Sequence, residues 1–120
     1  MKTLILTLIC LLGFSCTYAQ YQGPKENRVE SINVAHIMDN ADDLDHREAV
    51  VQVKGFIAEQ ISDEEFWFED SSGRLKVEID EEIMPNMPFD QTQHVVLTGE
   101  IDEEMGRVKM EVAQIELVDN

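Results

Sequence analysis

From residue 48 to the C-terminus, apolar side chains recur at every second position. A period of two is typical of β-strands that bury one face. Short polar segments rich in Asp, Glu, Ser and Gly separate the apolar runs, as turns between strands require. The pattern therefore predicts five strands, over residues 48–61, 65–69, 74–80, 93–101 and 107–118.

The alternation also predicts which side chains face the core. These inward residues are Val51, Val53, Gly55, Ile57, Ile61, Phe66, Phe68, Leu75, Val77, Ile79, Val95, Leu97, Ile101, Val108, Met110, Val112 and Ile115. Gly55 and Gly99 lie inside long strands, which is typical of strands that bend strongly as a sheet coils. Residues 62–64, 70–73 and 102–106 are predicted as turns.

The segment before the first strand predicts a short helix over residues 32–40, with Ser31 as its cap. Its apolar stripe would consist of Val34, Ile37, Met38 and Ala41. Residues 40–45 are predicted as an acidic connection. Between the third and fourth strands, residues 80–87 have room for one or two helical turns.

The order of these elements indicates the fold class. Three meander strands, a short link and two further strands match an all-β, five-stranded OB-fold Greek-key barrel, here with a short N-terminal α-helix. An SH3-like barrel is the structural alternative, and the link between the third and fourth strands favours the OB-fold. We expect a single OB-fold domain over residues 31–120, preceded by an extended tether over residues 20–30.

The first nineteen residues have the pattern of a secretory signal peptide. Met1-Lys2 supplies the positive start, residues 3–14 are almost entirely apolar, and Thr17-Tyr18-Ala19 predicts cleavage after Ala19. The apolar run is too short to cross a bilayer, so no stable membrane insertion is expected after cleavage. The alternatives are an uncleaved anchor and a lipoprotein signal with Cys16 as the lipidated residue.

Both cysteines of the chain, Cys10 and Cys16, lie in this predicted signal peptide. The mature chain over residues 20–120 would therefore have no disulfide and no thiolate metal site. A secreted, thiol-free domain of this size fits the bacterial periplasm. The formal net charge of −16 argues against binding to the phosphate backbone of nucleic acid or to anionic lipid surfaces.

A series of short segments carries a family resemblance. The segments are Gln22-Gly23-Pro24, Val53-Lys54-Gly55-Phe56-Ile57, Ile61-Ser62-Asp63, Phe66-Trp67-Phe68-Glu69-Asp70-Ser71-Ser72-Gly73, Val77-Glu78-Ile79-Asp80, Leu97-Thr98-Gly99-Glu100-Ile101-Asp102 and residues 108–115. In their order and spacing they resemble the bacterial OB-fold (BOF) family of periplasmic proteins, of the YgiW/YdeI stress-tolerance type. The resemblance implies a periplasmic, non-catalytic role in envelope stress tolerance, with cations and envelope components as ligands. It supplies no established ligand residues. Trp67 and the link over residues 80–89 depart from the family pattern.

Three Asp-Glu-Glu triplets each fall at the end of a predicted strand. Clustered carboxylates supply the oxygen ligands that Ca²⁺ and Mg²⁺ prefer. The candidate metal-binding residues are Asp63, Glu64, Asp80, Glu81, Asp102 and Glu103. The alternative is a solvated acidic surface, in which the second triplet favours the start of a helix. No other cofactor is indicated.

A second candidate site is an outward face that carries Trp67, Arg74 and Lys76. OB-folds commonly bind oligomers on their second and third strands, where aromatic side chains stack on rings. This face predicts recognition of a glycan, a peptidoglycan fragment or a protein partner of the envelope. The alternative is that the N-terminal helix or the tether covers Trp67.

Catalytic signals are weak in this chain. No nucleophile elbow or phosphate-binding loop occurs. The three histidines, His36, His46 and His94, have no partner at metal-ligand spacing. We therefore expect a non-enzymatic binding module in envelope stress tolerance, with divalent-cation binding as the first hypothesis and the Trp67 face as the alternative. Nothing in the sequence indicates an oligomeric state.

Overall fold

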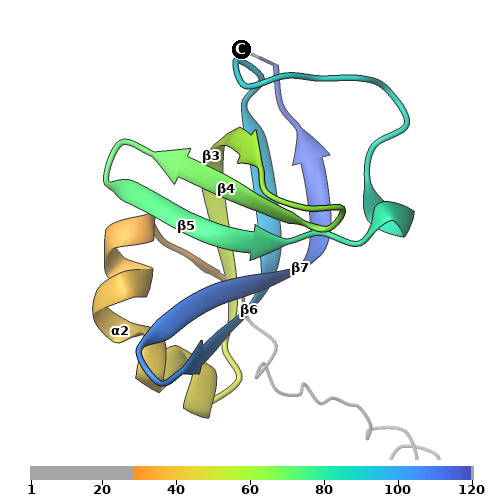
Figure 1. Ribbon diagram of the computed structural model, residues 1–120. Coiled ribbons are helices and arrows are strands. Elements are labelled where there is room, and N and C mark those ends of the chain that lie inside the picture. The colour runs from red at the N-terminus through yellow and green to blue at the C-terminus, as the bar shows by residue number, and fades with distance from the viewer. Residues whose placement is uncertain (1–28, 120) are drawn as a thin grey trace, which may run out of the picture.

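The computed structural model describes residues 29–119, which form a barrel with one helix against its end (Figure 1). The elements are β2 (Glu30–Ser31), α2 (Val34–His46), β3 (Val50–Gln60), β4 (Glu65–Asp70), β5 (Gly73–Glu78), the 3-10 helix η1 (Glu81–Ile83), β6 (Val95–Glu104) and β7 (Arg107–Leu117). The sheet order is β2-β3-β4-β5-β7-β6, and pairing of β3 with β6 closes the barrel. The all-β OB-fold prediction is confirmed. The sheet has six strands rather than five, because the two-residue β2 pairs parallel to β3.

The barrel interior follows the predicted alternation of inward side chains. Phe68, Leu75, Val77, Ile79, Val95, Leu97 and Met110 are at most 1 % exposed. Among the predicted inward residues, Ile61 is wrong: it lies beyond the end of β3 and is 41 % exposed. Val108, Val112 and Ile115 are only partly buried, and they pack against the core from β7.

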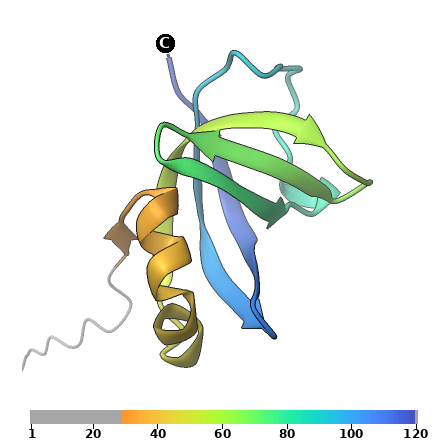
Figure 2. The same cartoon turned by 60° about the vertical axis from the view of Figure 1, so that its left-hand side comes forward.

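The helix α2 closes one end of the barrel, beside β5 and the β6–β7 hairpin (Figure 2). Its buried side chains are Val34, Ile37, Ala41 and Leu44. Two details of the predicted helix are wrong. Asn33, not Ser31, is the N-cap, because its side chain accepts a hydrogen bond from the backbone N–H of His36, while Ser31 belongs to β2. Met38, placed on the apolar stripe, is 47 % exposed.

The helix also continues beyond residue 40, where an acidic connection was predicted. Asn40 has non-helical backbone angles and kinks the helix, and its side-chain amide donates to the backbone carbonyl of His36. Beyond the kink, Ala41 and Leu44 keep the helical spacing and are buried. The burial of Leu44 thus outweighs the polar, charged sequence around it.

The predicted turn over residues 102–106 is shorter in the structure. β6 extends through Glu104, and β7 begins at Arg107, so only Met105 and Gly106 form the turn. Both have positive φ, of 51° and 83°, which matches the twist of a tight β-hairpin. The predicted helical turn after β5 is present as η1, with Asp80 as its N-cap.

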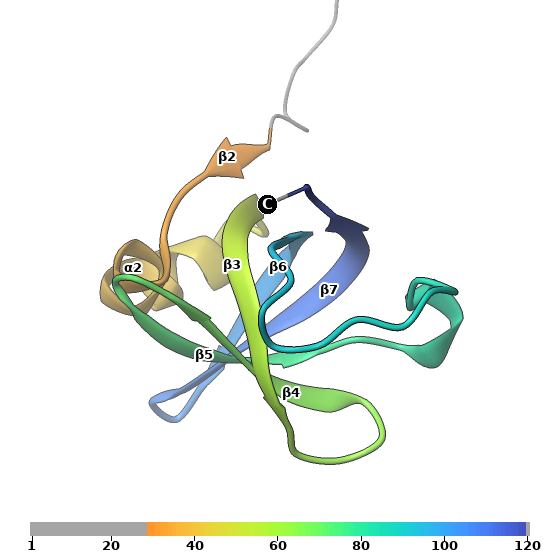
Figure 3. The same cartoon turned by 90° about the horizontal axis from the view of Figure 1, so that it is seen from above.

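β3 changes its partner strand at Gly55. Residues 50–55 pair with β6, and residues from Phe56 onward pair with β4. The strand therefore curves across the barrel and belongs to both of its halves (Figure 3). Of the helices over residues 29–119, none is long and apolar enough to cross a membrane.

Candidate ligand-binding face

The outer face of β4, β5, β7 and β6 carries a continuous row of side chains, which the strand register brings together. Trp67 on β4 lies opposite Lys76 on β5. Lys76 lies beside Lys109 on β7, and Lys109 lies opposite Asp102 on β6. Side chains that are paired across strands share one face of the sheet, so this row crosses four strands.

A second row lies two residues along each strand and therefore on the same outer face. Arg74 on β5 is opposite Glu69 on β4. Arg107 on β7 is opposite Glu104 on β6. We call Arg74, Lys76, Arg107 and Lys109 the basic block. It occupies the two central strands of this face.

On the other side of the first row lies a row of four glutamates. Their register positions are Glu65, Glu78, Glu111 and Glu100, one on each of the four strands. Lys109 connects the two rows, because its Nζ lies 2.9 Å from Glu78 Oε1. Hydrogen bonding to Glu78 raises the pKa of Lys109, and the charges of Glu65 and Glu111 add to this effect.

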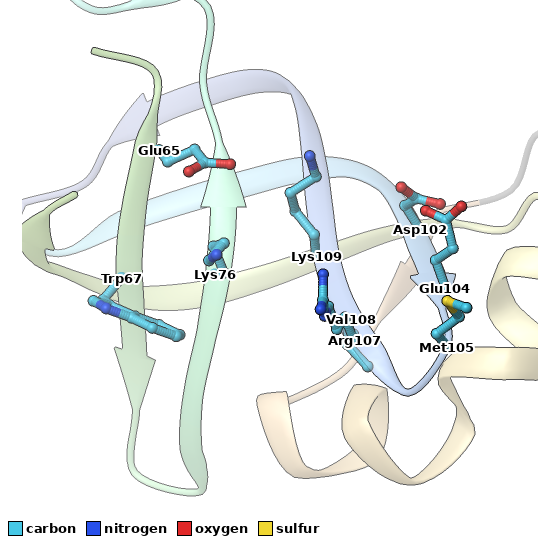
Figure 4. A pocket seen from close by; sticks show the side chains of 9 residues that line it. All are labelled: Glu65, Trp67, Lys76, Asp102, Glu104, Met105, Arg107, Val108 and Lys109. Carbon is cyan, nitrogen blue, oxygen red and sulfur yellow. The ribbon is translucent and has the colours of Figure 1, made fainter. Parts of the chain in front are cut away.

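A groove of about 590 Å³ runs along this face, between β4–β5 and the β6–β7 hairpin (Figure 4). We call it the Trp67 groove. It is lined by Glu65, Trp67, Lys76, Asp102, Glu104, Met105, Arg107, Val108 and Lys109. No residue of α2 belongs to this lining, and Trp67 is half-buried beside the lysines rather than beneath the helix.

Two cationic side chains, Arg74 and Lys76, lie near the Trp67 ring. The guanidinium carbon of Arg74 lies 4.3 Å from the ring centroid, and Lys76 Nζ lies 5.9 Å from it. Arg74 also makes long ion pairs with Glu69, at 3.6 Å, and with Glu59, at 3.9 Å. A guanidinium over one face of an indole holds both groups in place, and Trp67 also lines the groove.

Lys76 and Arg107 differ from their neighbours in the basic block. Within residues 29–119, neither has a carboxylate within ion-pair distance of 4.0 Å, although Glu104 is the cross-strand neighbour of Arg107. The chain has 25 acidic residues and only 9 basic ones. Two cations without a carboxylate partner in one groove are therefore the unusual electrostatic feature of this face.

Sequence reasoning placed Trp67, Arg74 and Lys76 on one face, and the structure brings these three side chains together. It missed Arg107 and Lys109. The signal for them was indirect. The OB-fold topology makes β5 and β7 parallel neighbours, and matching the inward and outward positions of the two strands sets Lys76 beside Lys109.

The acidic triplets meet in part. The first follows β3 and the second follows β5, and the backbone N–H of Ile79 donates to the carbonyl of Glu64 at 2.8 Å. The charge of Asp80 is the largest cause of a raised pKa at Glu64, followed by desolvation and the charges of Glu78, Glu81 and Asp63. These two triplets therefore share one edge of the barrel.

The third triplet lies apart, on β6. Asp102 and Glu104 line the Trp67 groove, and the backbone N–H of Glu103 donates to Asp45 Oδ2 of α2 at 2.9 Å. The six predicted metal ligands thus do not form one site. In the part of the chain that the structure describes, no group of three or more His, Cys, Asp and Glu side chains is arranged to hold a metal ion.

Comparison with known proteins gives relatives of similar length. The chain is 31 % identical to the calcium-regulated OB-fold protein CarO of Pseudomonas aeruginosa, over 98 % of this chain and 99 % of that protein. It is 34 % identical to protein YgiW of Escherichia coli K12, over 57 % of this chain and 52 % of that protein.

Solved structures agree on the fold. The structure of E. coli YgiW has a TM-score of 0.61 and 28 % identity, and covers 84 % of this chain and all of that one. A Stn1–Ten1 complex of S. pombe has a TM-score of 0.56 at 12 % identity, covering 78 % of this chain and 80 % of that chain, which shows the fold alone. The family described as bacterial OB fold (BOF) protein matches residues 13–117. The chain therefore belongs to the bacterial OB-fold (BOF) family.

Proposed function

We propose that this chain is a non-enzymatic binding module of the periplasm, active in envelope stress tolerance, which holds a glycan of the cell envelope in the Trp67 groove. The observation that carries the proposal is the position of Trp67, half-buried in the groove and opposite Lys76. β4 and β5 are the second and third strands of the barrel, the face on which OB-folds commonly bind oligosaccharides and oligonucleotides.

The chemistry of the groove suits a sugar ring. An indole presents a flat apolar surface, and the surrounding Lys, Arg, Asp and Glu side chains offer donors and acceptors for hydroxyl groups. A long nucleic acid is disfavoured by the chain's charge of −16 and by the glutamate row beside the basic block. The predicted signal peptide, which lies outside the described residues, supports the periplasmic location.

The test is co-sedimentation of the mature chain with purified peptidoglycan sacculi. We expect the native chain to sediment with them and Trp67→Ala to lose at least about fivefold in affinity, because stacking on one aromatic contributes about 1–3 kcal/mol. Met87→Ala is the matched control, since Met87 is 60 % exposed and lies outside the groove lining.

Circular dichroism should show that the Trp67→Ala variant keeps its β-sheet spectrum, as expected for a half-buried outer residue. A folded Trp67→Ala chain that sediments like the native one would contradict the proposal. Equal losses in Trp67→Ala and Met87→Ala would do the same.

A second candidate function is weak binding of Ca²⁺ or Mg²⁺ where the first two acidic triplets meet. It is supported by the charges that crowd Glu64 and by the calcium-regulated relative. If it holds, Ca²⁺ or Mg²⁺ at constant high ionic strength should raise the thermal midpoint of unfolding in a saturable way. Glu64→Gln should shrink that rise, and Glu103→Gln on the separate third triplet should not.

Without metal, Glu64→Gln is expected to stabilise the folded chain. The pKa of Glu64 is raised from its ordinary value of 4.5, so its ionisation lowers the stability of the folded state as the pH rises through this range. Glu64→Gln should therefore raise the midpoint at pH 7 even without metal, and less so in high salt. A flat response to both metals, or an equal response in Glu64→Gln, would exclude this candidate.

A further inference from the structure

The basic block is unusual because it places like charges side by side. Lys76 and Lys109 are direct neighbours on parallel strands, about 5 Å apart in backbone spacing. Arg74 and Arg107 follow two residues along the same strands, about 7 Å away. Like charges directly opposite each other in a sheet are destabilising. Four of the nine basic residues of the chain gather in this one place.

Internal ion pairs account for only half of the block. Lys109 is held by Glu78, and Arg74 by Trp67, Glu69 and Glu59. Lys76 and Arg107 both line the Trp67 groove, and no carboxylate of the described chain lies within 4.0 Å of either. Two positive charges therefore line the groove, Lys76 beside the indole and Arg107 farther from it, toward the β6–β7 hairpin (Figure 4).

The surroundings of the block limit the size of an anion. Carboxylates follow it on the neighbouring strands: Glu69 on β4, with Asp102 and Glu104 on β6. The glutamate row closes one end of it. A long polyanion would have to pass these carboxylates, whereas a compact anion needs only the space between the two cations.

We propose that the Trp67 groove is selective for a phosphorylated sugar: the ring stacks on Trp67, and the phosphate binds between Lys76 and Arg107. This inference rests on the proposed glycan-binding function and specifies its ligand class. A phosphomonoester carries between one and two negative charges at neutral pH, which two cations neutralise. Arg supplies a bidentate fork for phosphate oxygens and Lys a point charge.

Trp67 supplies the measurement, because it is the only tryptophan of the chain. Its fluorescence reports occupancy of the groove with no label. The mature chain is titrated with N-acetylglucosamine 6-phosphate, N-acetylglucosamine, N-acetylmuramic acid, inorganic phosphate and a short oligothymidylate. We expect saturable quenching by the phosphorylated sugar, with at least tenfold weaker binding of the other four compounds and a loss of affinity as salt is raised. Sacculi still retain the chain, because their sugars are present in large excess over it.

Single substitutions test which side chains bind the phosphate and which binds the sugar ring. Lys76→Ala and Arg107→Ala should each weaken binding of the phosphorylated sugar by about tenfold or more, as for one charge-assisted hydrogen bond. Lys54→Ala is the matched control, because Lys54 is an exposed lysine of β3 outside the groove lining. Trp67→Ala, followed by calorimetry because it lacks the reporter, should weaken binding while the fold survives.

The outcomes separate this inference from the proposed function. Equal binding of phosphorylated and neutral sugar, unchanged in Lys76→Ala, overturns the phosphate inference and leaves the glycan function standing. Equal binding of N-acetylmuramic acid, inorganic phosphate or oligothymidylate overturns the selectivity for a phosphorylated sugar. If no sugar binds and the chain does not sediment with sacculi, both the phosphate inference and the glycan-binding function are overturned.

A last arm identifies the source of the phosphorylated sugar. Vesicles of phosphatidylcholine with monophosphoryl lipid A present the same chemistry as a lipid headgroup. Sedimentation with them that Lys76→Ala abolishes supports a headgroup ligand, and binding of the free compound alone supports a soluble one. Vesicle binding that Lys76→Ala leaves intact, with no binding of the free compound, overturns the inference.

Discussion

Gly99→Ala is expected to destabilise the barrel by about 3 kcal/mol or more, a large part of the stability of a domain this size. A Cβ at Gly99 would clash with the backbone oxygen of Glu111 and would lie 2.9 Å from the Cα of Val112. Backbone atoms in a closed ladder cannot move aside as a flexible side chain does. The register of β6 and β7 shifts between Thr98 and Gly99, and the close approach occurs there.

Urea unfolding of the two chains side by side measures this effect. Gly106→Ala is the matched glycine control, because nothing lies within 4 Å of a Cβ there. Its φ of 83° still costs about 1–2 kcal/mol for an L-residue, so a smaller loss is expected. If Gly99→Ala unfolds at the urea concentration of the native chain, or loses no more than Gly106→Ala, the close packing of β6 on β7 is refuted.

Asp70→Ala is expected to cost about 3 kcal/mol, because one carboxylate accepts hydrogen bonds from three backbone N–H groups, in the β4–β5 turn and at the start of α2. Asp70 Oδ2 accepts from the backbone N–H of Val34 at 2.9 Å, at the start of α2. Asp70 Oδ1 accepts from Ser72, through its backbone N–H at 2.7 Å and its hydroxyl at 2.6 Å, and from the backbone N–H of Gly73 at 3.2 Å. Without the carboxylate, the bond from the backbone N–H of Ala35 to the Ser72 hydroxyl, at 2.9 Å, remains between the helix and the β4–β5 turn.

The pH dependence of Asp70 gives a second readout. Partial burial raises its pKa, but the hydrogen bonds from Ser72, Val34 and Gly73 outweigh this effect and lower the pKa below its ordinary value of 3.8. A lowered pKa in the folded state adds stability above pH 3.8, which is lost as the pH falls through the folded-state pKa. The free energy of unfolding of the native chain should therefore fall more steeply in acid than that of Asp70→Asn.

Asp90→Ala is the control for Asp70. Asp90 makes a similar local turn, accepting from the backbone N–H and the hydroxyl of Thr92 at 2.9 and 2.7 Å. Its carboxylate is not bonded to a helix or strand elsewhere in residues 29–119. We expect a loss of about 1 kcal/mol or less from Asp90→Ala. Equal losses at the two positions would show that the bond to α2 adds nothing.

The strands were predictable because one face of every strand is buried. A period of two locates each barrel strand and its inward side, as at Phe66 and Phe68. The errors fall where a distant contact decides the local structure. The helix continues past Asn40 because Leu44 reaches the core, and β6 extends past Asp102 because it pairs with β7.

The candidate face was only half predictable for the same reason. Trp67 and Lys76 lie on neighbouring strands of one hairpin, so the alternation of a short segment sets them opposite each other. Lys109 reaches them through the parallel pairing of β5 and β7, over 33 residues of chain. Likewise, the first two acidic triplets meet because β4 and β5 are antiparallel neighbours. The third triplet lies on β6, which pairs with neither of these strands.

Because β3 closes the barrel by pairing with β6, the chain can complete its fold only late in synthesis. Val50 pairs with Glu100, so the first long strand waits for a partner fifty residues later in synthesis. Helix α2 likewise buries its apolar stripe against strands that emerge after it. Structures dominated by such distant pairings fold slowly and as a unit. A nascent chain of this kind therefore stays open until it is nearly complete.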